Sequence, residues 1–298
     1  MMSDLQGISL AVIGGDKRDQ ILVQRLVELG AQINVIGLPV DDCDQVSIKN
    51  HLSHALTDVS ALILPMPGID PQGRVYAPLY DKKLYLNNEE LQALPSGCPI
   101  FVGVARPKLR EMAEKRGAEI IEVAEMDEFA ILNSVPSAEG AIQMAMEGLP
   151  ITIHGSRSII IGFGRLAITL TRMLMGLGSQ VTVIARDPVA RARAWEMGAK
   201  ALPMESLPEA LAEGDFIYNT IPAMILDQKM INLVNPEGMI IDLATAPGGT
   251  DFETARQKGI KAELAPGLPG KVAPKTAGKL VAKVYPGLIR QYVLSTGG

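Results

Sequence analysis

The sequence has few of the residues that most often carry metal, redox or acid–base chemistry. Its 298 residues include two cysteines, three histidines and one tryptophan, and 4% of the residues are aromatic. Cys43 and Cys98 stand alone, so neither a zinc motif nor a disulfide framework is indicated. His51 and His54 have helical spacing but no evident third ligand, so we predict no metal site. His154 precedes a strand, which is the wrong end of a parallel sheet for catalysis.

The chain also lacks an excess of positive charge and a long apolar run. Its net charge is −5 and its pI is about 5.4. Such a balance argues against nucleic acid or an anionic membrane as the main partner. We find no 18-residue apolar run free of charged or turn residues, and no basic, apolar signal segment at the start. We therefore expect a soluble, cytoplasmic protein.

Aliphatic and turn residues are abundant, and one glycine motif stands out among them. An apolar strand at 158–161 is followed by G-x-G-x-x-A and a helical run to 177, and a second strand follows at 180–185. In dinucleotide-binding folds these small residues permit the turn, admit the pyrophosphate and pack the helix on the strand. The alternative is a turn that serves packing alone. We predict that the cofactor contacts Gly162, Phe163, Gly164, Arg165, Leu166 and Ala167.

The residues after three later strands refine this prediction. An acid after the second strand binds the ribose of NAD, whereas an arginine suits the 2′-phosphate of NADP. Arg186 occupies this place and favours NADP, although it is alternatively a solvated surface residue, and Asp187 leaves NAD open. Thr220, with Pro222 close behind it, and Thr245 follow two further strands. Loops at these carboxyl ends face the nicotinamide half of the cofactor.

Strand-like and helix-like segments alternate in both halves, which predicts two doubly wound α/β domains with parallel sheets. The first domain, 1–136, is flavodoxin- or Rossmann-like, and Gly14-Gly15 takes the place of the dinucleotide motif. The second, 137–278, is the Rossmann NAD(P)-binding domain with a bridging helix. The C-terminal helix, 279–298, is a candidate to pack on the first domain.

Two segments between the predicted elements are candidates for the substrate site. The bridge is predicted as helices 125–132 and 138–147 around a loop, with Ser137 either capping the second helix or binding substrate beside Ser134. Residues 265–278 form a predicted glycine- and proline-rich loop that leads into a helix from about 276 to 294. Its Lys271 and Lys275 supply positive charge, or are ordinary surface lysines.

Several motifs occur together and carry a family resemblance. They are Ile13-Gly14-Gly15-Asp16-x-Arg18, Pro65-x-Pro67-Gly68, Ser137-Ala138-Glu139-Gly140-Ala141-Ile142, Gly162-Phe163-Gly164-Arg165 and Pro269-Gly270-Lys271-Val272-Ala273-Pro274-Lys275-Thr276. Together they resemble the A-subunit of dipicolinate synthase over nearly the whole chain. More distantly, the last motif resembles a loop of methylenetetrahydrofolate dehydrogenases.

The resemblance implies an NAD(P)-dependent oxidoreductase in the mother cell of a spore-forming bacterium. Its substrate would be hydroxytetrahydrodipicolinate or dihydrodipicolinate, from a branch of lysine biosynthesis, and its product pyridine-2,6-dicarboxylate. The family works with a separately encoded, flavoprotein-like chain, the B-subunit of dipicolinate synthase. We also expect a homo-oligomer.

A dicarboxylate substrate requires cations or N–H groups at both carboxylates, and loss of a ring hydroxyl requires an acid and a base. We expect Lys271, Lys275, Glu139 and Asp16 in the catalytic set. The candidate substrate contacts are Pro67, Gly68, Arg74, Ser134, Ser137, Lys271 and Thr276, although Thr276 is alternatively a helix cap.

Two other functions stay open at this point. One is an NADP-dependent dehydrogenase of another small carboxylate or of a folate. The folate version is weakened because Tyr76 and Tyr80, followed by Lys82 and Lys83, miss the Tyr-x-x-x-Lys spacing. The other is a protein that senses NADP without catalysis.

Overall fold

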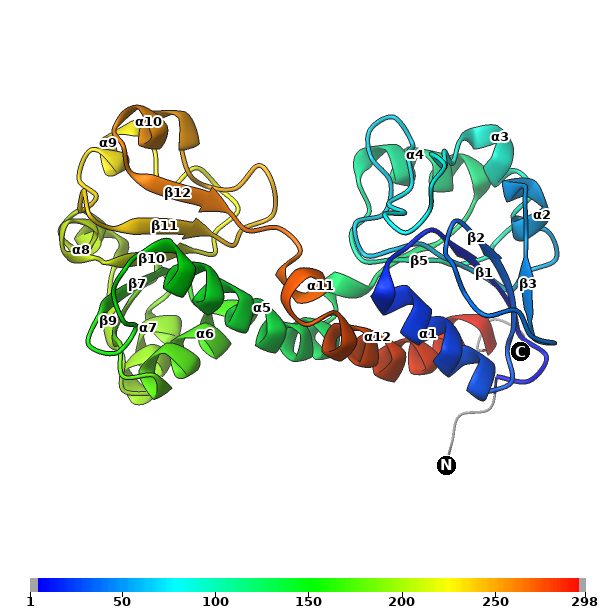
Figure 1. Ribbon diagram of the computed structural model, residues 1–298, viewed down its shortest axis with the longest axis horizontal. Coiled ribbons are helices and arrows are strands. Elements are labelled where there is room, and N and C mark those ends of the chain that lie inside the picture. Colours follow the sequence, from blue (N-terminus) through cyan, green and yellow to red (C-terminus); the bar gives the residue numbers. More distant parts are fainter. Residues whose placement is uncertain (1–4, 295–298) are drawn as a thin grey trace. The chain divides into compact units, whose positions relative to one another are not determined.

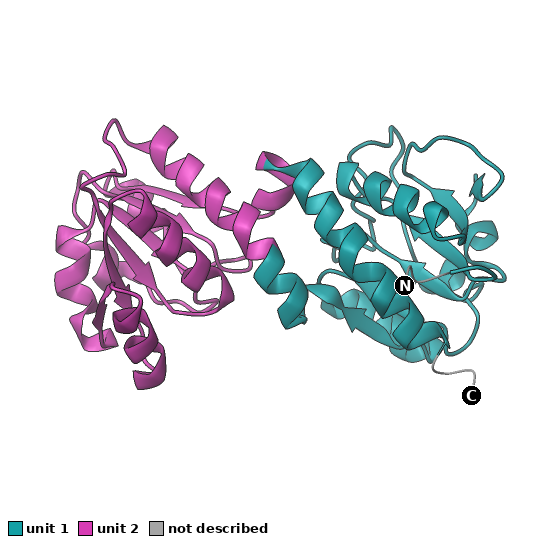
Figure 2. Ribbon diagram, turned by 90° about the horizontal axis from the view of Figure 1, so that it is seen from below, with its two compact units in different colours: residues 1–132, 273–298 teal, residues 133–272 magenta. Residues whose placement is uncertain are grey.

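The computed structural model describes residues 5–294 and divides the chain into two compact units (Figure 2). Unit 1 comprises residues 1–132 and 273–298, and unit 2 comprises residues 133–272. The sequence-based boundaries lie at 136/137 and 278/279 instead, a few residues further along the chain. The last four residues of the predicted C-terminal helix lie outside the described residues.

Unit 1 is built on a parallel sheet of six strands in the order β3-β2-β1-β4-β5-β6. The direction of winding reverses between β1 and β4, because β2 and β3 extend the sheet on one side and β4 to β6 on the other. Ligands of such sheets bind outside the carboxyl ends of the strands at this reversal. The strands are β1 (Ser9–Ile13), β2 (Gln32–Ile36), β3 (Val46–Ile48), β4 (Ala61–Ile63), β5 (Ile100–Val102) and β6 (Ile120–Glu122).

Helices cover both faces of this sheet (Figure 1). In β1, Leu10 and Val12 enter one core while Ala11 and Ile13 enter the other, because successive side chains of a strand point to opposite faces. The first core is covered by α1 (Lys17–Glu28) and α12 (Pro274–Ile289), and the second by α2 (Leu52–Leu56), α3 (Asn88–Leu91) and α4 (Pro107–Arg116). A 3-10 turn, η1 (Val123–Glu125), follows β6.

Unit 2 repeats the same strand order, β12-β11-β10-β7-β8-β9, and all of its strand pairs are parallel. Here the winding reverses between β7 and β10. Both sheets therefore have the order that doubly wound dinucleotide-binding folds use, which confirms the predicted fold class. The strands are β7 (Arg157–Ile161), β8 (Gln180–Ile184), β9 (Lys200–Leu202), β10 (Phe216–Asn219), β11 (Met239–Asp242) and β12 (Lys261–Leu264).

Aliphatic side chains fill both cores of unit 2, as the composition predicts. Ile160 faces one core with Leu170 and Leu174, and Ile159 and Ile161 face the other. The first core is covered by α6 (Arg165–Gly176), α7 (Pro188–Glu196), the second half of α5 (Asp127–Gly148) and α11 (Leu268–Val272). The second is covered by α8 (Leu207–Glu213), α9 (Gln228–Ile231) and α10 (Phe252–Gln257), with the 3-10 turn η2 (Met204–Ser206) before α8.

The bridge differs from its prediction. A single helix, α5 (Asp127–Gly148), replaces the two helices and the loop, and Pro136 lies inside it. Ser137 is not a cap, because its hydroxyl donates to the carbonyl of Asn133, 2.9 Å away, within the helix. Ala138, Ala141 and Ala145 are buried in the core of unit 2. This burial offsets the backbone hydrogen bond that Pro136 cannot make.

The prediction of a loop for residues 265–278 is also wrong in part. Residues Leu268–Val272 form the short helix α11, which packs on α5 where Gly140 has no side chain. The last helix begins at Pro274 after the N-cap residue Ala273, so Thr276 does not cap it. The helix ends at Ile289 and continues as a π-helical turn, η3 (Arg290–Leu294). The sequence pattern did not predict β3 and α9, which are short.

Gly278 allows α12 to pack closely on α1, within unit 1. A Cβ atom at Gly278 would lie 2.6 Å from Cδ1 of Ile21 and 3.1 Å from Cα of Arg18. At Gly287, on the same helix, a Cβ would meet no atom within 4 Å.

We therefore expect Gly278→Val to lower the free energy of unfolding by about 1–3 kcal/mol, the usual cost of overpacking. Gly287→Val is the matched control and should change stability little. Urea denaturation of the two variants measures the difference. Equal stabilities would contradict the close packing of α12 on α1.

Candidate functional site

The candidate cofactor site of unit 2 lies where the winding of its sheet reverses. The loop after β7 carries the glycine motif, and the loop after β10 begins with Thr220. The two loops are joined by hydrogen bonds, since the Thr220 N–H and hydroxyl both donate to the carbonyl of Ile161, at 3.0 and 2.8 Å. The glycine motif and Thr220, two separate sequence predictions, therefore lie together.

Gly162 and Gly164 have different structural requirements. Gly162 has a φ of +93°, and a Cβ there would lie 2.5 Å from the Thr220 hydroxyl oxygen. Any larger residue at this position would therefore strain the backbone and displace the neighbouring loop. Gly164 has an extended backbone that other residues can adopt, and a Cβ there would meet no atom within 4 Å.

The open space at Gly164 fits a phosphate group. Gly164 is the N-cap of α6 and provides no side-chain hydrogen bond to the first turn of the helix. The first N–H groups of a helix need acceptors and attract anions, and a bound pyrophosphate satisfies both needs. Ala167 is fully buried against the sheet, as the third small residue of the motif requires. These residues fit a dinucleotide.

Two buried polar residues that the sequence predictions missed hold the loops around this site. Asn219 and Asp242 end β10 and β11 and are fully buried, and the Asn219 amide donates to Asp242 Oδ1 at 3.1 Å. Asn219 Oδ1 accepts from the Ile221 N–H, which fixes the loop after β10. Asp242 accepts from the Ala244 and Gly249 N–H groups and from the Thr250 hydroxyl, which fixes the loop after β11. The sequence signal that could have indicated these two residues is a polar residue at the end of an otherwise apolar strand.

The other predicted cofactor residues of unit 2 differ in how they are held. Arg186 is exposed, whereas Asp187 caps α7 by accepting from the Val189 N–H at 2.9 Å. Asp187 thus has a structural role of its own, and the Arg186 side chain faces solvent. Pro222 and Thr245 are exposed in the loops after β10 and β11.

The substrate and catalytic candidates of unit 2 have different environments. Ser134 is buried, and its hydroxyl lies 2.6 Å from that of Thr169 on α6. Glu139 is exposed and lines a largely apolar groove between α5 and α6. Lys271 is exposed on α11. Ser137 donates within its own helix, as described above.

In unit 1, Asp16 belongs to a compact charged cluster at the start of α1. Its carboxylate accepts three side-chain hydrogen bonds from Arg18, from Nε at 2.9 and 3.2 Å and from the terminal nitrogen at 2.8 Å. Asp16 and Asp19 form a capping box, in which the Asp16 N–H donates to Asp19 Oδ2 at 2.8 Å. Asp16 therefore holds the start of the helix through its own side chain and through the capping box.

Asp19 is the most perturbed group of this cluster. It is 5% exposed, and burial raises its pKa from 3.8 to about 7, with the negative charge of Asp16 adding to the effect. Arg18 and the Asp16 N–H act on this pKa in the opposite direction. A Cβ on Gly15 would overlap Asp19, so the glycine pair after β1 makes room for this carboxyl group.

A cavity in unit 1 is lined by three predicted substrate contacts. Pro67, Gly68 and Arg74 line a pocket of about 290 Å³ together with Asp70, Tyr76 and Arg106. Pro67 and Gly68 follow β4, and Arg106 follows β5, so the pocket lies at the carboxyl ends of these strands. The sequence did not reveal Arg106 as a candidate, because its relation to Arg74 arises only from the folding of the sheet.

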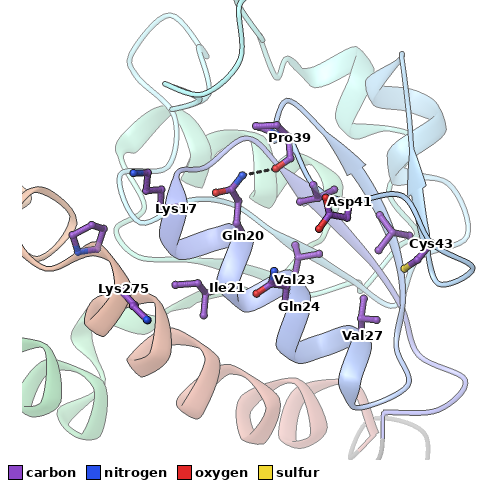
Figure 3. A pocket seen from close by; sticks show the side chains of 13 residues that line it. Lys17, Gln20, Ile21, Val23, Gln24, Val27, Pro39, Asp41, Cys43 and Lys275 are labelled. Atoms are coloured by element: carbon purple, nitrogen blue, oxygen red, sulfur yellow. Dashed lines mark hydrogen bonds between the residues drawn. The ribbon is translucent and has the colours of Figure 1, made fainter.

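Lys275 and Thr276 lie at the start of α12, in unit 1, and do not line this pocket. Both are exposed. Figure 3 shows Lys275 at the edge of a groove of about 700 Å³ that runs along α1 past Lys17 and Gln20. The Gln20 amide donates to the carbonyl of Pro39, and both residues line this groove. Lys271, the other predicted lysine, belongs to unit 2.

Residues 5–294 contain neither a candidate membrane span nor a candidate metal centre. None of the helices there combines the length and the apolar character needed to cross a membrane. No group of three or more histidine, cysteine or acidic side chains is arranged there to hold a metal ion.

Comparison with protein families agrees with this geometry. The family model described as D-isomer specific 2-hydroxyacid dehydrogenase, NAD binding domain, matches residues 135–247. The model of the N-terminal domain of the dipicolinate synthase A-subunit matches residues 9–124. The fold and the glycine loop thus define a dehydrogenase-like α/β protein with a nicotinamide-dinucleotide domain.

Individual relatives identify the family. The dipicolinate synthase A-subunit of Bacillus subtilis (strain 168) is 36% identical over 295 residues, which cover 98% of this chain and 99% of the relative. The crystal structure of the dipicolinate synthase A-subunit from Bacillus halodurans has a TM-score of 0.90 and 34% identity, covering 96% of this chain and 99% of that one. The chain belongs to the A-subunit family of dipicolinate synthase.

A more distant structure shares the fold alone. The apo-structure of D-lactate dehydrogenase from Escherichia coli has a TM-score of 0.66 and 15% identity, and covers 97% of this chain and 98% of that one.

The pKa of Asp19 gives a testable pH dependence. Between about pH 4 and pH 7 the carboxyl group is protonated in the folded chain and ionised in the unfolded chain. The folded state binds the extra proton, so its stability falls as pH rises through this window, by on the order of 1 kcal/mol per pH unit. Asp19→Asn removes this contribution. Urea denaturation across the window should therefore show a smaller fall for the variant, and parallel profiles would contradict the raised pKa.

Proposed function

We propose that this chain is an NAD(P)-dependent oxidoreductase that forms pyridine-2,6-dicarboxylate. The observation that carries the proposal is the glycine loop of unit 2, set at the reversal of a parallel sheet, in a member of the A-subunit family of dipicolinate synthase. The open space at Gly164 suits the pyrophosphate of a dinucleotide, and the family relationship suggests the substrate.

The proposed reaction has two balanced stages. Hydroxytetrahydrodipicolinate first loses its ring hydroxyl and a neighbouring proton as water, giving dihydrodipicolinate. Dihydrodipicolinate then gives up one hydride and one proton, and the product ring becomes aromatic. The nicotinamide supplies the hydride acceptor when the cofactor is bound. Because aromatisation favours the products, the work left to the protein is to position the ring and bind its charges.

The cofactor contacts follow from the loops around β7 and β10. Backbone N–H groups at the start of α6 would hold the pyrophosphate, and the predicted contacts Phe163, Arg165 and Leu166 border it. Thr220, Pro222 and Thr245 would border the nicotinamide half. The exposed Arg186 supports NADP as the preferred cofactor, because a 2′-phosphate needs a cation and Asp187 is occupied as a helix cap.

The proposed catalytic set is smaller than the predicted one. Lys271, Lys275 and Glu139 are exposed, so each is accessible to a substrate or partner. We propose a positioning role for Asp16, since Arg18 holds its carboxylate. We also propose that the chain works with the B-subunit, since its relatives are named as one subunit of a synthase, and that it acts as a homo-oligomer in the cytoplasm of the mother cell during sporulation.

The activity can be tested by mixing the chain with enzymatically generated hydroxytetrahydrodipicolinate and NADP, with and without the B-subunit. Reduced nicotinamide and pyridine dicarboxylate should appear together. Gly164→Val should abolish both signals and cofactor binding without loss of stability, because its side chain enters the space proposed for the pyrophosphate. Gly176→Val, at an equally open position at the other end of α6, is the control and should retain both.

Two outcomes would contradict the proposal. If the unaltered chain binds NADP but gives no product under either condition, the chain senses the nucleotide without catalysis or acts on another carboxylate. If Gly164→Val binds NADP as well as the unaltered chain does, the dinucleotide lies elsewhere.

The cofactor preference is tested at Arg186. We expect Arg186→Gln to weaken NADP binding about tenfold or more, the scale of one charge-assisted contact, and to leave NAD binding nearly unchanged. Arg193→Gln, on the exposed face of α7 where it pairs with Glu196, is the control. Equal losses for both cofactors would place Arg186 away from the 2′-phosphate. Fluorescence titration of the reduced cofactors measures the preference.

A further inference from the structure

Two arginines line the pocket at the carboxyl ends of β4 and β5. Arg74 and Arg106 come from different loops and line the same cavity, and both are exposed. Within residues 5–294 neither guanidinium makes an ion pair or a hydrogen bond. A guanidinium has five N–H donors and keeps its charge at any physiological pH. Two guanidinium groups in one cavity therefore favour the binding of an anion.

The walls that carry these arginines are fixed before any ligand binds. The Asp70 carboxylate accepts from the Gln72 and Arg74 N–H groups, both at 2.9 Å, and so holds the turn that leads to Arg74. On the other wall, Glu122 accepts from the Ala105 N–H at 2.7 Å and fixes the residue before Arg106. The backbone on both sides of the cavity is thus organised independently of the arginine side chains.

The two walls are also joined to each other. The Val104 N–H donates to the carbonyl of Met66 at 3.1 Å, and a Cβ at Gly103 would overlap that residue. Gly68 completes the junction, since its φ is +65° and a Cβ there would lie 3.0 Å from the carbonyl of Val104. A site with fixed walls loses little conformational entropy when a ligand binds.

Charge and size select the class of ligand. The lining carries two arginines against the single carboxylate of Asp70, one oxygen of which already accepts the two N–H groups of its turn. The cavity of about 290 Å³ is at the lower end of the range for small-molecule sites. A one-ring dicarboxylate matches both properties, whereas a folate exceeds the volume.

We propose that Arg74 and Arg106 bind the two carboxylates of the substrate, with one guanidinium at each. This inference rests on the proposed function for the identity of the substrate. Pro67, Gly68 and Tyr76 line the same cavity and would border the ring. The pocket also lies beside the buried cluster of α1, since the Gly15 N–H donates to the Tyr76 carbonyl at 2.8 Å.

Calorimetric titration of the full chain with pyridine-2,6-dicarboxylate tests the proposal. Arg74→Gln and Arg106→Gln should each weaken binding about 10- to 100-fold, the loss of one charged, bidentate contact. The unaltered chain should bind pyridine-2-carboxylate, which has one carboxylate, about as weakly as either variant binds the dicarboxylate. Arg106→Lys keeps the charge without the paired donors and should recover part of the affinity.

Controls separate this site from the cofactor site and from general damage. Arg25→Gln, on α1 in unit 1 where it pairs with Glu28, should bind the dicarboxylate normally. Both pocket variants should keep the affinity for NADPH and the melting temperature, because the two side chains are exposed and do not hold the fold. In turnover assays they should raise the KM for the substrate and leave the KM for NADP unchanged.

The outcomes also distinguish this proposal from the proposed function. If the unaltered chain turns over the substrate and both glutamine variants keep its affinity for the dicarboxylate, the proposed role of the two arginines is overturned. The proposed activity then stands. If the variants lose dicarboxylate binding but the chain turns over no substrate, the anion site stands and the activity is overturned. If the unaltered chain neither binds nor turns over these dicarboxylates, both are overturned.

Discussion

The cofactor site depends on the parallel pairing of β7 with β10. This pairing brings the carboxyl ends of two strands that are far apart in the sequence to the same edge of the sheet. Gly162 and Thr220 then lie so close that no side chain fits between them. The reversal of winding at this pair leaves the N-terminus of α6 facing outward, where an anion can satisfy its N–H groups.

Buried polar groups keep this edge in order. Asn219 and Asp242 are removed from water, so each must find hydrogen-bond partners within the protein. They find them in the N–H groups of the following loops, and these hydrogen bonds fix the loop backbone. In unit 1, the capping box of Asp16 and Asp19 orders the residues after β1 in the same way. In both units, buried carboxyl or amide groups thus order the loops at the carboxyl ends of the strands.

The two units share one strand order but differ in the residues that follow their strands. Unit 2 has the small residues that let a dinucleotide approach the backbone. Unit 1 has Gly14 and Gly15 at the equivalent turn, but Val75, Tyr76 and Asp19 fill the space above them. Its open cavity lies instead after β4 and β5, where it is lined by arginines. This difference is the basis for the proposed roles of unit 2 in cofactor binding and of unit 1 in substrate binding.

The sequence by itself determined the α/β class, most strands and helices, the glycine loop and the family. These features depend on local periodicity and on residues close together in the chain. Tertiary structure decided the continuity of α5 through Pro136, the short helix α11 and the loss of a capping role for Ser137 and Thr276. Burial of Ala138 and its neighbours outweighs the local preference for a break there. The meeting of Arg74 with Arg106 depended on the order of strands in the sheet, because only the pairing of β4 with β5 brings their loops together.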